Sequence, residues 1–231
     1  MTNHILITGA SRGIGYHTAL HLAACGVRVT AVSRSAEGLR MLKDKNPELI
    51  DPLTLQITSG TAPFTLKKHL EETEYPLTGI IHNAGLLINK PFTELTDREW
   101  TEQIRVNLMA PVSLTRELLP CFRGRGHILH ISTMGGFQGS EKFPGLSAYS
   151  TSKGALATLT ECLALELADR NIQVNCLCLG AVQTEMLNEA FPGLKAPVQP
   201  GEMGEHIASF ALHGNKFYNG KVLPVALNNP S

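Results

Sequence analysis

The sequence has 231 residues, of which 43% are hydrophobic and 17% are charged, and its 20 Lys and Arg side chains balance 20 Asp and Glu side chains. This composition is typical of a globular protein with room for one α/β domain, and it excludes a disordered chain. With no net positive charge to attract nucleic acid or an anionic membrane surface, we expect neither as a partner.

The start of the chain and its cysteines bear on the cellular compartment. Residues Met1 to Thr8 lack the basic region, the long apolar stretch and the cleavage site of a secretory signal. The least polar long segment, Ala155 to Ala168, contains two glutamates and is too short to span a bilayer. The 5 cysteines form no CxxC pair, which favours reduced thiols over a disulfide framework or a zinc site, and the histidines show no ligand spacing. We expect a cytoplasmic protein without a metal.

Short apolar runs alternate with helical patterns along the whole chain. The expected strands are His4 to Thr8, Val27 to Ser33, Leu53 to Ile57, Gly79 to His82, Gly126 to Ser132, Ile172 to Leu179 and Lys221 to Ala226. The expected helices are Ile14 to Cys25, Ser35 to Lys45, Phe64 to Glu72, Asp97 to Pro120, Tyr149 to Asp169 and Gly201 to Leu212. Several strands are continuous hydrophobic runs, as in a parallel sheet that is buried on both faces. The pattern predicts a single doubly wound α/β domain over residues 1–231, with ligands at the carboxyl ends of the strands.

The least regular region covers residues 184–204 and contains three prolines and three glycines. A long irregular segment in a domain of this size predicts either a lid over the ligand or a disordered connection.

A glycine-rich turn follows the first expected strand. The segment Thr8-Gly9-Ala10-Ser11-Arg12-Gly13-Ile14-Gly15 leads directly into a helical pattern. Glycines let backbone N–H groups approach a pyrophosphate, whose charge the helix N-terminus favours. A glycine cluster can also be only a tight turn, but its place between a strand and a helix favours a dinucleotide site.

The second expected strand ends Ala31-Val32-Ser33-Arg34, without an acid. Enzymes that prefer NAD usually carry Asp or Glu there to accept the ribose hydroxyls. A guanidinium can instead hold a 2′-phosphate through paired charged hydrogen bonds, and Arg12 could reach the same phosphate. The alternative is that both arginines are solvated surface charges. The pattern favours NADP(H) as the cofactor.

Three polar residues predict the reacting end of the site. Ser132 ends the fifth expected strand, and Tyr149 and Lys153 lie four positions apart at the start of a helical pattern, hence on one face. A free tyrosine titrates near pH ~10, and a neighbouring ammonium lowers its pKa. Tyr149 is therefore a credible proton donor to a carbonyl, and Ser132 could hydrogen-bond the same carbonyl. This spacing also occurs by chance on solvated helices, but here it lies downstream of the glycine turn.

These motifs together resemble the short-chain dehydrogenase/reductase family over essentially the whole chain. The resemblance rests on segments in the family's order and at nearly its spacings: Thr8 to Gly15, Asn83-Ala84-Gly85, Asn107, Ser132, and Tyr149 with Lys153. The glycine turn and Arg34 are most similar to 3-oxoacyl-acyl-carrier-protein reductases. The resemblance implies a Rossmann-type domain with seven parallel strands flanked by helices.

The resemblance also implies four catalytic roles. Tyr149 would be the acid/base, and Lys153 would tune it and bind the nicotinamide ribose. Ser132 would position the substrate oxygen, and Asn107 would hold a water that links Lys153 to solvent.

Further cofactor contacts follow from the same resemblance. Asn83, Ala84 and Gly85 would lie beside the dinucleotide. The segment from Gly180 to Thr184 would contact the nicotinamide carboxamide, through the backbone of Val182 and the hydroxyl of Thr184.

The chain departs from the family pattern in four places. Leu179-Gly180 replaces the family's Pro-Gly, and Gln56-Ile57 stands where many members have an acid near the adenine. The serine and the tyrosine are 17 positions apart, a few more than usual, with Gly139 to Phe143 as the extra loop. The lid over residues 184–204 is short, and the tail from Val225 to Ser231 lacks the usual acidic-glycine turn.

We therefore expect an NADP(H)-dependent oxidoreductase that interconverts a carbonyl and an alcohol by hydride transfer. The alternative is a dinucleotide-binding regulatory protein of the same fold, but such members usually lose the tyrosine or the lysine. A small ketone or aldehyde fits the short lid, and an acyl thioester stays open as a substrate.

The helices Asp97 to Pro120 and Tyr149 to Asp169 carry apolar residues on more than one face, among them Trp100, Leu108 and Leu163. In the family such helices pair across a two-fold axis, which implies a homodimer or a homotetramer. The alternative is that both faces pack within one subunit.

Overall fold

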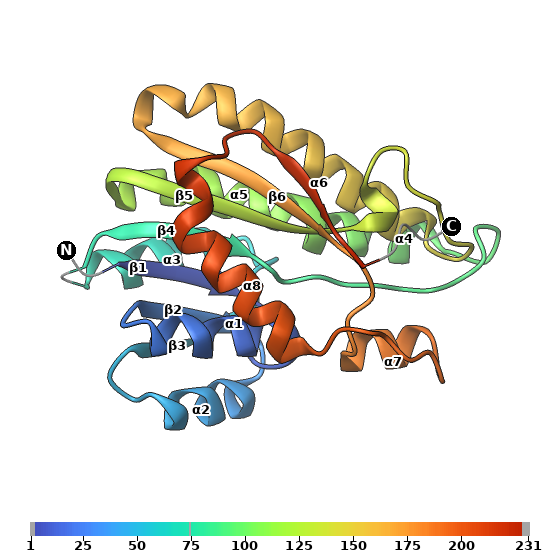
Figure 1. Ribbon diagram of the computed structural model, residues 1–231, viewed down its shortest axis with the longest axis horizontal. Coiled ribbons are helices and arrows are strands. Elements are labelled where there is room, and N and C mark those ends of the chain that lie inside the picture. Colours follow the sequence, from blue (N-terminus) through green and yellow to red (C-terminus); the bar gives the residue numbers. More distant parts are fainter. Residues whose placement is uncertain (1–2, 74, 228–231) are drawn as a thin grey trace.

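Seven strands form one parallel sheet in the computed structural model, which describes residues 3–73 and 75–227 (Figure 1). Across the sheet their order is β3-β2-β1-β4-β5-β6-β7. Along the chain they are β1 (His4–Thr8), β2 (Arg28–Ser33), β3 (Ile50–Thr54), β4 (Leu77–His82), β5 (Phe122–Thr133), β6 (Ile172–Leu179) and β7 (Val222–Val225). The predicted fold class is confirmed. The end of the predicted tail, Asn228 to Ser231, lies outside the described residues.

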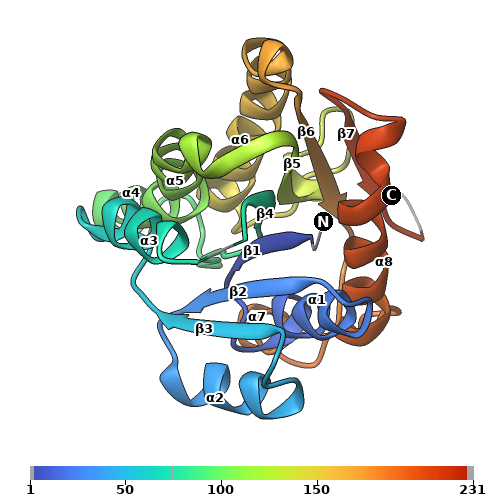
Figure 2. The same ribbon diagram turned by 90° about the vertical axis from the view of Figure 1, so that its left-hand side faces the viewer.

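Helices cover both faces of the sheet (Figure 2). One face carries α1 (Gly13–Ala24), α2 (Ala36–Lys45) and α8 (Pro200–His213). The other face carries α3 (Ala62–Glu71), α4 (Asp97–Ile104), α5 (Ala110–Leu118) and α6 (Ser147–Glu166). Alternate residues of β1 supply both cores: Ile5 and Ile7 pack in the cluster that contains Leu22 of α1, and Leu6 packs in the cluster that contains Leu114 of α5. Burial on both faces explains why the strand sequences are continuous apolar runs.

The prediction for β3 was displaced along the chain. Leu53 to Ile57 was expected, and the strand covers Ile50–Thr54 with Pro52 inside it. Because β3 is an edge strand, the N–H that proline lacks need not pair with a neighbour.

Two helical regions also differ from the prediction. The expected continuous helix Asp97 to Pro120 is divided into α4 and α5 by a π-helical turn, Arg105–Met109. Such turns are frequent at functional sites, and this one contains Asn107. The segment expected to be irregular contains a short helix, α7 (Glu185–Ala190), whose first turn is capped by the Thr184 hydroxyl accepting from the Leu187 N–H at 3.2 Å.

The strand order defines where a ligand can bind. The chain runs from β1 outward to β2 and β3 and then returns to β4 on the other side of β1. In open parallel sheets this reversal leaves a crevice at the carboxyl ends of the two strands. The fold thereby brings the glycine turn after β1 beside Asn83 after β4.

Four histidines are buried in the described strands: His4 of β1, whose pKa burial lowers, and three others whose shifts are larger. His82 on β4 and His130 on β5 are register partners with ring centroids 5.3 Å apart, and His127 donates from Nδ1 to the Ala211 carbonyl at 3.0 Å. Burial lowers the pKa of His82 to about 3, that of His127 to about 4, and that of His130 well below its usual value. All three imidazoles are therefore neutral in the folded protein at pH 7.

We expect these histidines to make the fold acid-sensitive. In the unfolded chain each imidazole binds a proton below about pH 6.5, whereas the folded chain resists protonation until the pH is much lower. Their stabilisation is complete above about pH 6.5 and is lost as the pH falls toward 4. The free energy of unfolding, measured by urea denaturation, should fall by about 2 kcal/mol per histidine between pH 7 and pH 5. His127→Gln should make this slope shallower and exposed His206→Gln should not; equal slopes would contradict the prediction.

Candidate active site

A cavity of about 1100 Å³ opens at the carboxyl ends of the strands. Its lining contains every residue that the sequence predicts for the site except Asn107. The cavity extends from the glycine turn and the ends of β2 and β3, past the end of β4, to β5, α6 and α7.

The glycine turn is shaped for a close backbone approach. The φ angles of Gly9 and Gly13 are +71° and +58°, a region that favours glycine. A Cβ on Gly15 would collide with the Gly9 carbonyl and with the side chain of Asn83. Asn83 Nδ2 donates to the carbonyls of Thr8, at 3.0 Å, and Gly9, at 3.1 Å, and so ties the end of β4 to the turn.

The N-terminus of α1 receives no side-chain cap. Its first N–H groups begin at Gly13, which lines the cavity together with Ile14 and Gly15. Uncapped N–H groups with the positive end of a helix dipole are suited to an anion, and a dinucleotide pyrophosphate fits this cradle.

The end of β2 carries hydroxyl and guanidinium groups. The Ser33 hydroxyl donates to the Ser11 hydroxyl at 2.7 Å, and Arg34 is exposed at the rim of the cavity. Arg12 also lines the cavity and forms an exposed ion pair with Glu189 of α7 at 3.4 Å. Both arginines thus line the cavity, and Arg12 already has a carboxylate partner.

The segment after β3 forms the wall beside these arginines. Gln56, Ile57 and Thr58 line the cavity there. Gln56 Nε2 donates to the Thr58 hydroxyl at 3.1 Å, and Arg105 donates to the Thr58 carbonyl at the same distance.

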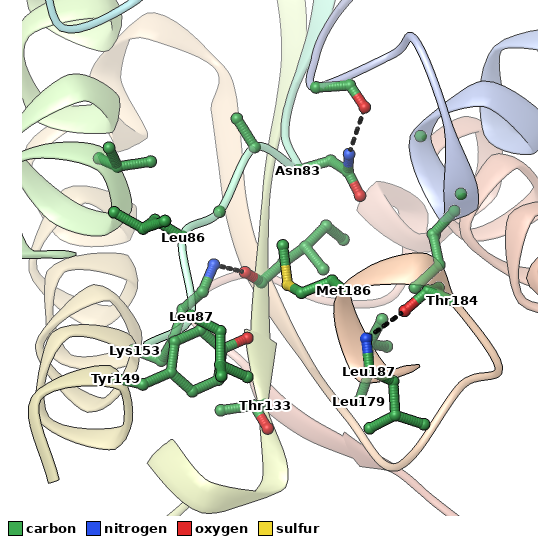
Figure 3. Close-up of a pocket in the computed structure, with 18 of the residues that line it drawn as sticks. Asn83, Leu86, Leu87, Thr133, Tyr149, Lys153, Leu179, Thr184, Met186 and Leu187 are labelled. Atoms are coloured by element: carbon green, nitrogen blue, oxygen red, sulfur yellow. Dashed lines mark hydrogen bonds between the residues drawn. The ribbon is translucent and has the colours of Figure 1, made fainter. Parts of the chain in front are cut away.

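Tyr149 and Lys153 lie on the first turns of α6 and line the cavity beside β5 (Figure 3). The Lys153 ammonium donates to the Ile131 carbonyl at 2.7 Å, and its burial lowers its pKa to about 8. Desolvation raises the pKa of the Tyr149 phenol to about 12. Desolvation is the cause of this shift, and the expected effect of the Lys153 ammonium on the Tyr149 pKa stays a prediction. Tyr149 is a protonated phenol at neutral pH, ready to donate.

Asn107 lies behind the cavity wall rather than on it, and it is fully buried. Its amide donates to the Leu86 carbonyl and to the Ser152 hydroxyl, both at 2.9 Å, and its Oδ1 accepts from the Leu86 N–H at 2.8 Å. A Cβ on Gly85 would lie 3.5 Å from Asn107 Oδ1 and 3.6 Å from Lys153 Nζ. Asn107 therefore joins Leu86, which lines the cavity, to Ser152 of α6, the residue before Lys153.

Two neighbouring hydroxyls end β5, and they differ in their partners. The buried Ser132 hydroxyl donates to the Lys153 carbonyl at 2.9 Å, so its proton is already engaged. The Thr133 hydroxyl accepts from the Gly135 N–H at 3.4 Å and keeps its own proton free. Thr133 lines the cavity next to Tyr149 (Figure 3). The sequence analysis missed Thr133, and its place one residue after the strand-end serine was the only available signal.

The end of β6 closes the opposite side of the site. Gly180 donates its N–H to the Val225 carbonyl at 2.9 Å, and a Cβ on it would lie 2.9 Å from the Ala226 Cβ. Val182 pairs with Val198 in a single β-bridge. The Thr184 hydroxyl accepts from Leu187 and retains a proton to donate into the cavity (Figure 3).

Within residues 3–73 and 75–227, no group of three or more His, Cys, Asp and Glu side chains is arranged to hold a metal ion. None of the helices in these ranges combines the length and the apolar character needed to cross a bilayer.

Comparisons with known proteins agree with this geometry. A model of the short chain dehydrogenase family matches residues 3–195. The chain is 31% identical to a 3-oxoacyl-[acyl-carrier-protein] reductase of Aggregatibacter actinomycetemcomitans, over 89% of this chain and 87% of that protein. It is 30% identical to the 5-keto-D-gluconate 5-reductase of Escherichia coli K12, over 95% of this chain and 92% of that one.

Solved structures share the fold over almost the whole chain. A 3-ketoacyl-(acyl-carrier-protein) reductase from Brucella melitensis, complexed with NADH, superposes with a TM-score of 0.88 at 22% identity, over 99% of this chain and 98% of that one. A protein from Beutenbergia cavernae, described as an NAD(P)-dependent gluconate 5-dehydrogenase with bound NADP, superposes with a TM-score of 0.86 at 25% identity, over 97% and 95% of the two chains.

Proposed function

The chain belongs to the short-chain dehydrogenase family and is an oxidoreductase of the carbonyl/alcohol class, and we propose that it uses NADP(H), with Tyr149 as the acid/base. The observation that carries the proposal is a protonated Tyr149 beside a buried Lys153 in a cavity whose other end is a glycine turn. Nothing in the comparisons supports the regulatory alternative.

The cofactor proposal rests on the glycine turn and the two arginines. The pyrophosphate would lie on the N–H groups of Gly13 to Gly15, and a 2′-phosphate between Arg12 and Arg34. When bound, the nicotinamide supplies or accepts the hydride. The nicotinamide would lie between Lys153 on one side and the Val182 backbone with the Thr184 hydroxyl on the other.

The chain's own part in the chemistry is to orient the substrate oxygen and to move one proton. Tyr149 donates its phenolic proton to the carbonyl oxygen during reduction, and it accepts that proton back during alcohol oxidation. Lys153 places a positive charge beside the phenolate that forms. The free proton of Thr133 makes it the hydroxyl that hydrogen-bonds the substrate oxygen, while Ser132 seats α6.

The apolar faces of α4, α5 and α6 support a homodimer or a homotetramer. Leu156 is buried within the subunit, whereas Met109 and Leu165 are 46% and 81% exposed. We also keep the cytoplasm as the proposed compartment, since all five cysteines are free thiols.

Tyr149→Phe tests the catalytic proposal. Removing the phenolic proton should lower kcat for carbonyl reduction by about 100-fold or more, because proton transfer by a positioned group contributes at least that much. NADPH oxidation at 340 nm measures the rate, and fluorescence titration with NADPH should give an unchanged Kd. Full activity in the variant would refute the role of Tyr149.

Cofactor preference tests the two arginines. We expect NADPH to bind more tightly than NADH, and Arg34→Ala or Arg12→Ala to weaken NADPH about tenfold or more while leaving NADH unchanged. Glu189→Gln frees Arg12 and should tighten NADPH binding. Arg40→Ala, an exposed arginine outside the cavity, is the control. A wild-type preference for NADH would overturn the assignment.

Three variants distinguish the role of the Thr133 hydroxyl from that of the Ser132 hydroxyl. Thr133→Val should lower kcat/KM about tenfold or more without changing the Kd of NADPH, and Thr133→Ser should restore activity. Ser132→Ala should instead lower the melting temperature, because α6 loses one of its hydrogen bonds to β5. If Ser132→Ala alone reduces kcat/KM, the sequence-based role of Ser132 holds and that of Thr133 fails.

Sedimentation velocity at micromolar concentration tests the assembly. We expect a dimer or a tetramer, because the exposed apolar helix faces need a partner surface. A single monomeric species would remove the proposal.

A further inference from the structure

The reacting end of the cavity has an apolar lining. Apolar side chains from the segments after β4 and β5, from the loop before α6 and from α7 line the cavity: Leu86, Leu87, Met134, Phe143, Leu146 and Leu187. The lining also contains charged residues, from the glycine turn, the end of β2, α4 and α7 as well as Lys153. Lys153 donates to Ile131, and Glu185 lies against the glycine turn, 3.6 Å from the place that a Cβ on Gly13 would take.

This lining constrains the substrate. A carboxylate or phosphate close to the reacting carbonyl would lose its water without gaining a charged partner other than Lys153, which the tyrosine needs. The reacting end therefore fits an uncharged, hydrophobic compound.

A second hollow, of about 750 Å³, adjoins the first. The two share Gly135, Phe143 and Leu146 as lining residues, which form their common border. Among its other lining residues are Pro91, Phe92 and Phe137. Phe92 is 70% exposed and Phe143 is 42% exposed, so a bound apolar chain would cover aromatic surface that now faces water.

The extra loop Gly139 to Phe143, before α6, forms part of the wall of this hollow, and hydrogen bonds stabilise its conformation. Lys142 donates to the Phe137 carbonyl at 2.6 Å and to the Ser140 hydroxyl at 2.8 Å, so its ammonium is engaged within the loop. The Lys90 N–H donates to the Gly145 carbonyl at 3.1 Å, which joins the loop to the segment before α4. At the border, the Gly135 backbone packs against Ser150, because a Cβ there would lie 2.8 Å from the Ser150 hydroxyl, and Phe143 is the exposed residue that both hollows share.

We propose that the substrate is an uncharged carbonyl compound with an extended apolar tail, which leaves Tyr149 past Phe143 and occupies the second hollow beneath Phe92. This inference rests on the proposed function for the identity of the reacting group. The position of the tail is inferred independently, from the lining residues that the two hollows share.

A homologous series of unbranched methyl ketones, from 2-butanone to 2-undecanone, tests the tail site with NADPH oxidation as the readout. Once the chain reaches the second hollow, kcat/KM should rise about two- to fourfold for each added methylene. Phe92→Ala should lower kcat/KM for the longest ketone about tenfold and leave the shortest unchanged. Phe64→Ala, which removes an exposed phenylalanine of α3 outside both hollows, should change neither.

A second variant fills the hollow instead of enlarging it. Thr151 is exposed, lines only the second hollow, and can be replaced by tryptophan. Thr151→Trp should reduce kcat/KM for long ketones alone. Equal kcat/KM along the series, or equal effects of Phe92→Ala on short and long ketones, would overturn the tail site. A preference for a ketone with a terminal carboxylate over its neutral counterpart would overturn the uncharged class.

A binding measurement distinguishes failure of the tail site from failure of the proposed reaction. Melting temperatures are measured with NADP⁺ and secondary alcohols of the same chain lengths. If no ketone is reduced but long alcohols raise the melting temperature more than short ones, and Phe92→Ala removes the difference, the tail site holds and the proposed reaction fails. If ketones are reduced but long and short alcohols give equal shifts, the reaction holds and the tail site fails.

Discussion

The seating of the first turns of α6 on β5 is the constraint on which the site depends. The Ser132 hydroxyl bonds the Lys153 carbonyl, and the Lys153 ammonium bonds the Ile131 carbonyl, so helix and strand are joined by both ends of one residue. A Cβ on Gly136, in the turn that follows β5, would lie 2.8 Å from the Gly154 nitrogen, which shows how closely this turn approaches α6. This contact fixes Tyr149 at the cavity and buries Lys153, and burial sets the protonation of both groups.

The two ends of the cavity differ in the chemical groups that line them. The dinucleotide end offers backbone N–H groups and arginines, which suit phosphate charge. The reacting end offers apolar side chains around one protonated phenol, which suit a neutral carbonyl. The short helix α7 adjoins both: Glu189 pairs with Arg12 at one end, and Leu187 lines the other. The protein as a whole has no net charge, but its charges are separated along the cleft.

Several predictions failed where packing outweighed local pattern. The third strand was expected to begin after Pro52, yet β3 contains this residue, because an edge position tolerates proline. The apolar periodicity from Asp97 onward gave no sign of the π-helical turn, because that turn is stabilised by the contacts of Asn107 with Leu86 and Ser152. The choice between Ser132 and Thr133 depends on which hydroxyl proton is already bonded, and only the three-dimensional contacts reveal that.

The sequence by itself determined the fold class, the order of strands and helices, the family and the residues that gather around the cleft. These follow from periodicity, glycine placement and motif order, which are local properties of the chain. The tertiary structure decided the pKa of Tyr149, the place of Asn107 behind the wall, the pairing of Arg12 with α7 and the second hollow beside Phe143. Each of these depends on desolvation or on contacts between segments far apart in the chain, and neither can be read from residue order.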